Sequence, residues 1–248
     1  MRVAIIGAGW AGLAAAAELT SKNIPLTLYE TAREPGGRAR KIRYNDLDLD
    51  NGQHILLGAY SECLRLMKLC GVADDALLRL PLKCFFSPDF LIHSVGIAAK
   101  LPAPLDLLGA FIKAKGMTPK QKLSALRFMT AMKLHGFTLK QDTTVAALLD
   151  EHGQDGKLRD CLWEPLCVSA LNTPIKTASA QIFLNVLRDG LFGGKGCSDM
   201  LIPQKNLGDV FPQPALDYVA QHGGEIRAGV SVTEIKPLAS GFTVATRD

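Results

Sequence analysis

Residues Val3 to Leu13 read VAIIGAGWAGL, an apolar run that stops at a glycine and continues with two more glycines in the spacing G-x-G-x-x-G. Arg2 to Ile6 predicts a buried strand, because its side chains are apolar on both faces, as in the centre of a parallel sheet. The alanine-rich segment Leu13 to Ser21 predicts a helix directly behind the glycines. Strand, tight turn and helix in this order are typical of an α/β nucleotide-binding fold.

Each of the three glycines has a physical role in such a turn. Gly7 permits the sharp turn after the strand, Gly9 lets a pyrophosphate approach the backbone, and Gly12 lets helix and strand pack closely. A second strand, Ile24 to Tyr29, ends at Glu30, eighteen residues after the third glycine. An acid there can accept hydrogen bonds from both ribose hydroxyls. These elements predict a dinucleotide site, and Glu30 does not by itself separate FAD from NAD.

The residues after Glu30 favour FAD through a family resemblance. The pattern E-x-x-R-x-x-G-G-R, which ends at Arg38, resembles the second FAD fingerprint of the superfamily of flavin amine oxidases, protoporphyrinogen oxidases and phytoene desaturases. The resemblance implies that Gly36 and Gly37 bring backbone amides near the flavin chain. It also implies that Arg38 serves the phosphates, while Arg33 matches a more peripheral position. The alternative is a Pro-Gly-Gly surface turn with solvated arginines.

The next segment carries the candidate catalytic residues. Lys41 to Asp50 predicts two strands joined near Asn45-Asp46, and it leads into the sequence DNGQH, which ends at His54. In the superfamily a D-x-G-x-x segment passes beside the isoalloxazine ring, so the resemblance implies that Gln53 and His54 lie close to the chemistry. We interpret His54 as a candidate acid and Gln53 as a residue that orients flavin or substrate. The alternative for His54 is a satisfied structural histidine.

The middle of the chain changes from strand patterns to helix patterns. A helix is predicted over 60–69, and a hairpin over 80–95 turns at Pro88-Asp89. Further helices are predicted over 105–115, 120–134, 144–152 and 177–189, the second of them with an apolar stripe of Leu123, Leu126, Met129 and Met132. We therefore expect a Rossmann-like, glutathione-reductase-like FAD-binding domain of residues 1–59 and 204–248. A mainly helical substrate domain of residues 60–203 interrupts it.

The last fifth of the chain returns to the first domain. Pro212 begins a predicted helix that ends at Gly223-Gly224. Gly229 to Ile235 resembles the superfamily's returning strand, and the resemblance implies that the backbone of Val232 meets the adenine. The alternative for Val232 is a plain core valine. Relatives continue beyond the strand predicted over 242–246, so we expect the chain to be a C-terminally truncated fragment.

Two segments narrow the resemblance. Gln53 to Tyr60 and Trp163 to Pro174 resemble the squalene-associated, FAD-dependent branch, the hydroxysqualene dehydroxylases. The resemblance implies an FAD-dependent oxidoreductase that removes the hydroxyl of hydroxysqualene reductively, with a hydrophobic isoprenoid as substrate. Desaturation of a phytoene-type polyisoprenoid and amine oxidation are the alternatives, and a nucleotide-sensing module without turnover is the non-enzymatic one. Trp163 to Pro174 is otherwise a buried helix and turn.

Composition bounds the partners and the location. The formal net charge is +4 without any Lys/Arg block, which argues against nucleic acid as a partner. The six cysteines form no CxxC pair and no zinc pattern, so we expect no metal and reduced thiols in a cytoplasmic protein. Apolar and basic residues alternate between 107 and 133, which suggests peripheral contact with the inner membrane face; ordinary helices with solvated lysines are the alternative. The residues concerned are Leu107, Leu108, Phe111, Ile112, Lys113, Lys115, Lys120, Lys122, Arg127 and Lys133.

Overall fold

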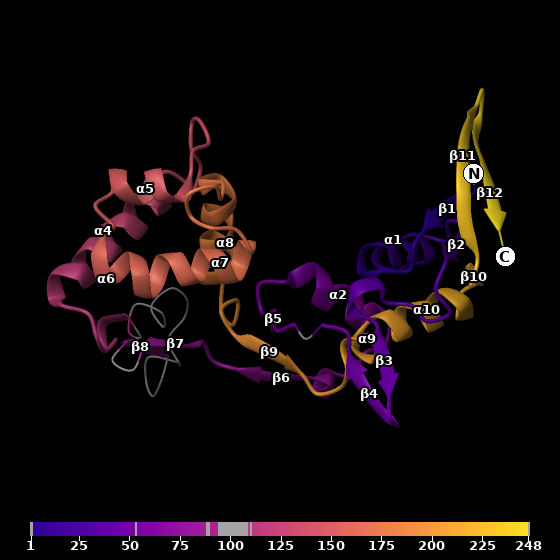
Figure 1. Cartoon of the computed structure of the whole chain (residues 1–248), viewed down its shortest axis with the longest axis horizontal. Coiled ribbons are helices and arrows are strands. Elements are labelled where there is room, and N and C mark those ends of the chain that lie inside the picture. The colour runs from indigo at the N-terminus through magenta and orange to yellow at the C-terminus, as the bar shows by residue number, and fades with distance from the viewer. Residues whose placement is uncertain (1, 53, 88–89, 94–108, 110, 248) are drawn as a thin grey trace. The chain divides into compact units, whose positions relative to one another are not determined.

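The structure, a computed structural model, describes residues 2–52, 54–87, 90–93, 109 and 111–247 (Figure 1). It divides the chain into two compact units. The first unit contains Met1–Leu56, Tyr60–Leu78 and Leu201–Asp248, and the second contains Leu57–Ala59 and Arg79–Met200. Gln53, the Pro88-Asp89 turn and, from the helix predicted over 105–115, residues 105–108 and 110, Leu107 and Leu108 among them, lie outside the described residues.

A three-stranded parallel sheet lies at the centre of the first unit. Strand β2 (Leu26–Glu30) lies between β1 (Val3–Ile6) and β10 (Glu225–Ala228), with Val3 opposite Leu26 and Glu225 opposite Thr27. Helix α1 (Trp10–Ser21) follows β1 directly. It begins three residues before the predicted start, because the Leu13 N–H already donates to the carbonyl of Gly9. The predicted strand, glycine turn, helix and second strand are therefore present, but β1 lies at the edge of the described sheet and Ile6 is 48% exposed, so the prediction of a strand buried on both faces is wrong.

Two helices pack on α1 and close the core of this unit. These are α2 (Ser61–Leu69) and α10 (Pro212–Gln221), which bury Leu66, Met67 and Val219 with the small side chains of α1. Outside this core, Arg65 of α2 forms an ion pair with Glu18 of α1 at 2.7 Å. Residues 60–78, which the sequence placed in the substrate domain, thus belong to the first unit.

A β-hairpin and a short helix complete the first unit near the glycine-rich segments. Strands β3 (Lys41–Tyr44) and β4 (Leu47–Asp50) pair antiparallel, as predicted, with Lys41 opposite Asp50. The short helix α9 (Leu207–Val210) contacts β3. Elsewhere in the chain, β5 (Leu56–Leu57), β9 (Met200–Pro203) and β6 (Leu77–Leu80) form another sheet, in which β9 is central.

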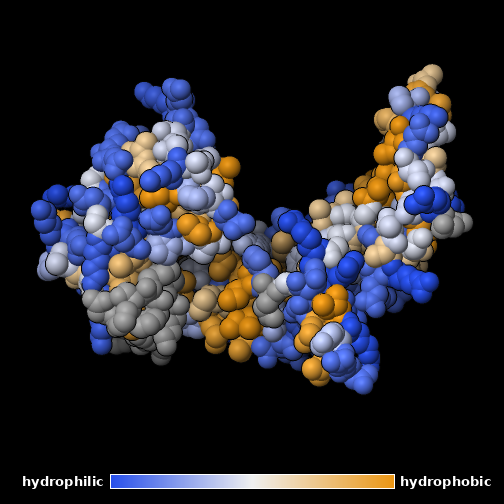
Figure 2. Space-filling model, in the orientation of Figure 1, coloured by the Kyte–Doolittle hydropathy of each residue, from blue (hydrophilic) through white to orange (hydrophobic). Residues whose placement is uncertain are grey.

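The end of the chain differs from the prediction by one strand. The predicted return, Gly229 to Ile235, overlaps β11 (Ser231–Leu238), which pairs with β12 (Gly241–Arg247) in a separate hairpin. The strand that joins the parallel sheet is β10, immediately before it, and its four residues are too few for a clear pattern. Apolar surface follows the β11–β12 hairpin in Figure 2, where Phe242 is 71% exposed.

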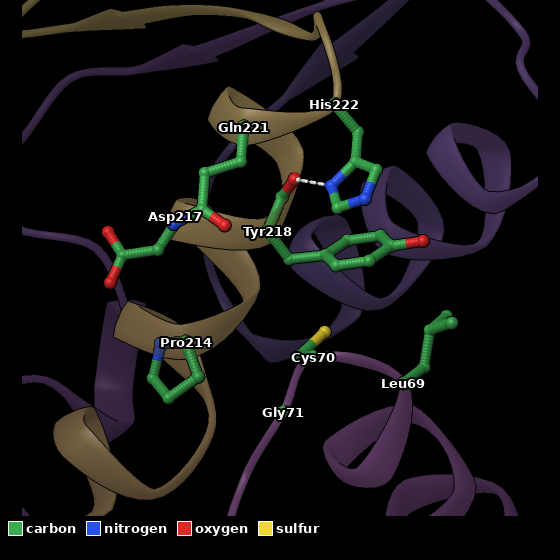
Figure 3. Close-up of a pocket in the computed structure, with 8 residues that line it drawn as sticks. All are labelled: Leu69, Cys70, Gly71, Pro214, Asp217, Tyr218, Gln221 and His222. Carbon is green, nitrogen blue, oxygen red and sulfur yellow. Dashed lines mark hydrogen bonds between the residues drawn. The ribbon is translucent and has the colours of Figure 1, made fainter.

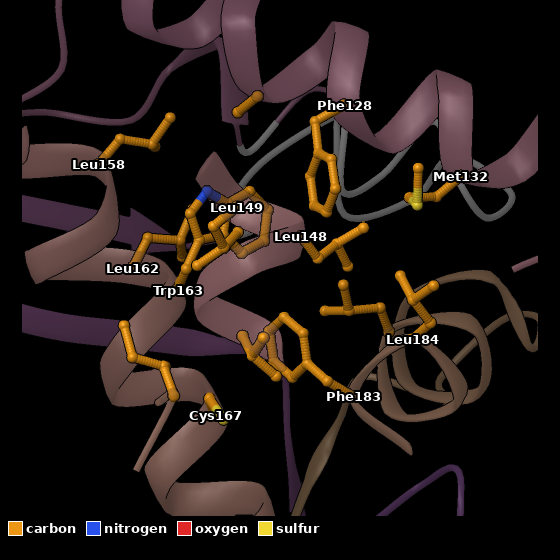
Figure 4. Packing of buried hydrophobic residues seen from close by; sticks show 14 of the residues in the cluster. Phe128, Met132, Leu148, Leu149, Leu158, Leu162, Trp163, Cys167, Phe183 and Leu184 are labelled. Atoms are coloured by element: carbon orange, nitrogen blue, oxygen red, sulfur yellow. The ribbon is translucent and has the colours of Figure 1, made fainter. Parts of the chain in front are cut away.

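The second unit is built mainly from helices around one apolar core. Its elements are β7 (Lys83–Ser87), β8 (Phe90–His93), α4 (Pro119–Leu134), α5 (Val145–Glu151), α6 (Gly156–Leu158), a π-helix (Arg159–Trp163), α7 (Glu164–Leu171) and α8 (Ala180–Phe192). Figure 4 shows Phe128, Trp163 and Phe183 packed in this core. The Trp163 ring meets the Phe128 ring edge-on, with centroids 5.3 Å apart.

A buried amide organises the polar contacts of this core. Gln154 is fully buried, and its Oε1 accepts a hydrogen bond from Trp163 Nε1 at 3.0 Å. Its Nε2 donates to the Ser124 hydroxyl oxygen at 2.9 Å and to the His152 carbonyl at 3.0 Å. The buried amide is therefore satisfied at both ends, as a polar group in a core must be.

The predicted apolar stripe of α4 is only partly right. Ala125, Phe128 and Met132 are buried, whereas Leu123 and Leu126 are 47% and 41% exposed. A repeat of three residues falls short of the 3.6-residue turn, so it drifts around the helix, while the steps of three and four from Ala125 to Met132 stay on one face. Among the described residues, no helix combines the length and the apolar character needed to cross a bilayer.

Candidate functional site

The three glycines after β1 have different surroundings. Gly7 has a φ of +96°, the left-handed region that favours glycine. A Cβ on Gly12 would lie 1.9 Å from the Gly7 carbonyl oxygen, so α1 can pack this closely only without a side chain there. A Cβ on Gly9 would meet nothing within 4 Å, and its φ of −73° is ordinary. Gly7 and Gly12 are therefore required by the fold, whereas Gly9 leaves its backbone open to a ligand.

The start of α1 suits an anion. Gly9 is the N-cap residue and offers no side chain to the first helical N–H groups, and the first turn contains no acidic residue. These N–H groups have no partner inside the helix, and the helix dipole adds a partial positive charge at this end. Open backbone at Gly9 and free amides behind it fit the pyrophosphate of a dinucleotide such as FAD.

Glu30 is held in place at the end of β2. Its Oε2 accepts a hydrogen bond from the Ala8 N–H at 2.6 Å, and its Oε1 accepts one from the Ala32 N–H at 2.8 Å. Each carboxylate oxygen can accept a second hydrogen bond. The predicted ribose acceptor is thereby oriented by two backbone amides beside the glycine turn.

The second fingerprint lies against the first. The Gly36 N–H donates to the Ala8 carbonyl at 2.7 Å, and a Cβ on Gly37 would lie 3.2 Å from the Cα of Gly9. Gly36 and Gly37 have φ values of +112° and +57°, so the turn itself requires glycine at both positions. The structure thus brings together residues that are separated by 28 positions in the sequence (36 − 8 and 37 − 9). Arg33 and Arg38 are both exposed.

The loop after β4 carries His54. The His54 side chain is exposed, and no hydrogen bond of its imidazole is present among the described residues, from which its neighbour Gln53 is missing. The loop begins at Asp50, whose Oδ1 accepts a hydrogen bond from the Leu207 N–H at 2.7 Å. The predicted catalytic roles of His54 and Gln53 remain predictions.

Val232 lies near the start of β11, half-buried and opposite Thr246. A register shift follows it in the strand, between Val232 and Glu234. Just before it, the Val230 N–H donates to the Glu30 carbonyl at 3.0 Å. Val232 therefore lies two residues after Val230, which is hydrogen-bonded to the end of β2. The contact of Val232 with the adenine stays a prediction.

A surface pocket of about 520 Å³ lies between the end of α2 and α10. Figure 3 shows its lining residues, among them Cys70, Tyr218 and His222. The Tyr218 and His222 rings are stacked with centroids 4.2 Å apart, and burial raises the pKa of the Cys70 thiol to about 11. The thiol is therefore protonated at neutral pH and a poor nucleophile. The pocket is lined by none of the predicted site residues.

Comparison with known proteins places this geometry in a family. Residues 10–248 match the family described as flavin containing amine oxidoreductase. The chain belongs to this family. The predicted superfamily is thereby confirmed, and so is the flavin cofactor FAD.

Curated relatives of this flavoprotein family cover most of the chain. A hydroxysqualene dehydroxylase of Zymomonas mobilis is 31% identical over 234 residues, which are 90% of this chain and 52% of the relative. A zeta-carotene desaturase of Arabidopsis thaliana is 25% identical over 276 residues, with 99% of this chain and 46% of the relative covered. The chain therefore spans about half the length of the curated relatives it matches.

Solved structures of other proteins share the fold of this chain. An oxidoreductase of Methanosarcina mazei superposes with a TM-score of 0.68 at 16% identity, over 99% of this chain and 56% of that one. A protein described as a putative protoporphyrinogen oxidase of an Exiguobacterium species gives 0.60 at 19% identity, over 99% and 56%. At these identities the likeness concerns the fold, a mixed α/β architecture.

Sequence reasoning missed the residues that hold the site together through their backbones. Ala8 donates to Glu30 and accepts from Gly36, and Ala32 donates to Glu30. A backbone contact leaves no signal in the residue type, so composition could not have identified these alanines. Asn51, which bonds the Arg38 carbonyl, was inside a quoted motif but without a role.

Proposed function

We propose that this chain forms the FAD-binding part of an oxidoreductase that acts on a polyisoprenoid, with reductive dehydroxylation of hydroxysqualene to squalene as its reaction. One observation carries the cofactor part of the proposal: the second fingerprint packs on the first, with Gly37 against Gly9 beside the open start of α1. The substrate part rests on the 31% identity to a hydroxysqualene dehydroxylase. Its product would enter hopanoid or sterol precursor synthesis.

The chain's residues have distinct proposed tasks around the cofactor. Backbone amides at Gly9 and the start of α1 hold the pyrophosphate, and Glu30 accepts the ribose hydroxyls. Arg38 balances phosphate charge, with Arg33 further out and Val232 against the adenine. Bound FAD supplies hydride transfer to or from carbon, a chemistry that amino-acid side chains lack.

His54 is the proposed acid of the reaction. Its imidazole, exposed and without a partner among the described residues, is free to hold a proton at one ring nitrogen and to release it to the departing hydroxyl oxygen. A positioned acid contributes on the order of 10² to 10⁴ in rate. Gln53 is the proposed residue that orients flavin or substrate.

The second unit is the proposed substrate domain, inserted between the two parts of the FAD-binding domain. Its core is apolar and its helices are short, with caps such as Thr144 and Ser179 that accept from backbone N–H groups of α5 and α8. A helical insertion can form an apolar wall for an isoprenoid without changing the cofactor site. The same scaffold can therefore serve different substrates.

The test of this function uses the full-length flavoprotein that contains the chain. It is incubated anaerobically with reduced flavin and hydroxysqualene, and the lipids are analysed by mass spectrometry. We expect squalene, and a His54→Ala variant that forms squalene 10² to 10⁴ times more slowly. Squalene formed at an unchanged rate would reject His54 as the acid, and no squalene at all would reject the reaction.

Oxidative desaturation of a polyisoprenoid is the second candidate. It is favoured by the zeta-carotene desaturases among the relatives, one of which aligns with 99% of this chain. The same lipid analysis separates the two reactions. A desaturase would introduce new double bonds into a carotenoid precursor with oxidised flavin and would form no squalene from hydroxysqualene. Amine oxidation ranks third. A flavin that binds but cycles with no lipid, amine or porphyrin would support a nucleotide-sensing module instead.

We also propose a cytoplasmic protein with peripheral contact at the inner membrane face, through α4. This helix contains no Asp or Glu, and Leu123, Leu126 and Leu134 are exposed on it beside Arg127 and Lys133. Apolar side chains among basic ones suit an anionic lipid surface. In liposome flotation we expect the protein to float with anionic vesicles and the Leu126→Asp variant to stay in the soluble fraction. Equal recovery of the wild type in the soluble fraction with and without anionic lipid would reject the membrane contact.

A further inference from the structure

Asn51 makes two hydrogen bonds to the segment that follows the glycine pair. Its backbone N–H donates to the Arg40 carbonyl and its Nδ2 donates to the Arg38 carbonyl, both at 3.2 Å. These bonds lie just past the pairing of Lys41 with Asp50, so they continue the contact of the hairpin beyond its last strand residues. Asn51 is exposed, and its side-chain amide nevertheless donates to the protein backbone.

These bonds join the loop that carries His54 to the two fingerprints. The Gly36 N–H bonds to Ala8, and Gly37 touches Gly9. The carbonyl of Arg38, the next residue, accepts from Asn51. Contacts thus run from the open backbone of the glycine turn, through the glycine pair, to a residue three positions before His54.

The start of the loop is also held from a second direction. Asp50 Oδ1 accepts from the Leu207 N–H at the start of α9, and Lys41 Nζ lies 3.3 Å from Asp209 Oδ1 of the same helix. Neighbouring Asp209 raises the pKa of Lys41, so the Lys41 ammonium stays positively charged at neutral pH. Three residues reach at most about 11 Å, so whatever fixes Asn51 limits where His54 can lie.

We propose that Asn51 is a positioning residue: its side-chain amide fixes the His54 loop to the Gly36–Arg38 turn and so sets the imidazole relative to the bound cofactor. The inference rests on the proposed function, because it concerns the geometry of that site. Asn51 itself acts through the Arg38 carbonyl and the loop. The role requires a donor at Nδ2, since a carbonyl oxygen only accepts.

Two near-isosteric changes test the requirement for a donor in the full-length flavoprotein. Asn51→Asp places an acceptor against the Arg38 carbonyl, and Asn51→Leu removes the donor at similar size. For both we expect FAD to bind roughly 2- to 10-fold more weakly, the effect of losing one hydrogen bond. We also expect a changed visible circular dichroism of the flavin, faster amide exchange over residues 51–57, and a lower kcat with little change in KM. Asn51→Gln keeps a donor on a longer arm and should recover part of each loss.

A control separates positioning from plain stability. Arg65→Leu removes the ion pair to Glu62 within α2 and the ion pair to Glu18 of α1, which lies about 13 Å along α1 from Gly9. It should lower the thermal midpoint without altering the flavin spectrum. Asn51 variants that bind FAD and give wild-type dichroism and kcat would overturn the inference while leaving the proposed function intact. A wild-type protein that binds no FAD would instead defeat the proposed function.

Discussion

Two helical glycines, one in each unit of this chain, have opposite surroundings. Gly12 lies in α1 of the first unit, where a Cβ would come within 1.9 Å of the Gly7 carbonyl oxygen. Gly190 lies in α8 of the second unit, where a Cβ would meet nothing within 4 Å beyond its own helix. Close backbone approach therefore requires glycine at position 12, whereas Gly190 only weakens its helix. The difference teaches that a glycine in the sequence indicates a site only where the backbone geometry excludes a Cβ.

The largest expected effect comes from filling the tight contact in the first unit. Gly12→Val would force α1 away from β1, because two branched methyl groups cannot share space with a carbonyl oxygen. We expect loss of FAD binding and destabilisation beyond about 4 kcal/mol, in the range of severe core defects. Chemical denaturation and FAD titration measure it. Gly190→Ala, the matched helical control, should stabilise by about 0.5–1 kcal/mol through helix propensity; equal effects of the two changes would break the comparison.

The core of the second unit should respond to cavity formation. Phe183 is fully buried there, next to the aromatic packing of Figure 4. Phe183→Ala is expected to cost about 3–5 kcal/mol, because the lost ring leaves a void that the neighbours only partly fill. Calorimetry of the full-length protein with and without FAD measures this cost. A loss below about 1 kcal/mol would mean that the unit is loosely packed.

A smaller loss is expected from the buried amide of the same unit. Gln154→Leu removes the acceptor of Trp163 Nε1 and leaves that N–H buried without a partner. An unmade buried hydrogen bond of this kind costs about 1–3 kcal/mol. A double-mutant cycle with Trp163→Phe checks the reason, because it separates the hydrogen bond from the cavity that the smaller ring leaves. Gln154→Leu should cost less in the Trp163→Phe background than in the wild type, and an equal cost in both backgrounds would contradict the assignment.

The smallest effect is a pH dependence on the surface of the first unit. Hydrogen bonds from Lys22 and Arg65 lower the pKa of Glu18 from 4.5 to about 2. A carboxyl whose pKa is lowered in the folded state contributes stability that is fully present above pH 4.5 and is lost as the pH falls toward 2. The difference in unfolding free energy between wild type and Glu18→Gln should therefore shrink over this window. A difference that stays constant from pH 6 to pH 2 would refute the ion pairs.

The sequence predicted the first unit better than the second, because the patterns of the first unit join residues that are close together in the sequence. The glycine turn, Glu30 and the glycine pair fall within 38 residues, so spacing identified the turn and Glu30, and a family resemblance identified the glycine pair. Strand β10 escaped, because four residues carry little pattern and its partner β2 is almost 200 positions away. In the second unit the π-helix and the Gln154 contacts depend on packing between distant segments. Leu123 and Leu126 were misjudged for a local reason, because their three-residue repeat drifts around the helix and leaves them exposed.

Within the site, positions that need a particular residue type were easier to predict than positions that any residue can fill. Glycine tolerates positive φ, so Gly7 could be assigned to the sharp turn, and its φ is positive. Ala8 and Ala32 contribute only N–H and C=O groups, which every residue except proline has. Their part in orienting Glu30 became visible only with the geometry.

FAD titration of Gly9→Val in the full-length flavoprotein tests the central claim most directly. The position has open space for a side chain and an ordinary φ, so the apoprotein should keep its fold and thermal midpoint. The new side chain would occupy the space that a pyrophosphate needs at the start of α1. We therefore predict an unchanged midpoint of the apoprotein and FAD affinity reduced at least about 100-fold, or about 2.7 kcal/mol. Wild-type FAD affinity in this variant would contradict the account, because the cofactor would then not lie against the glycine turn.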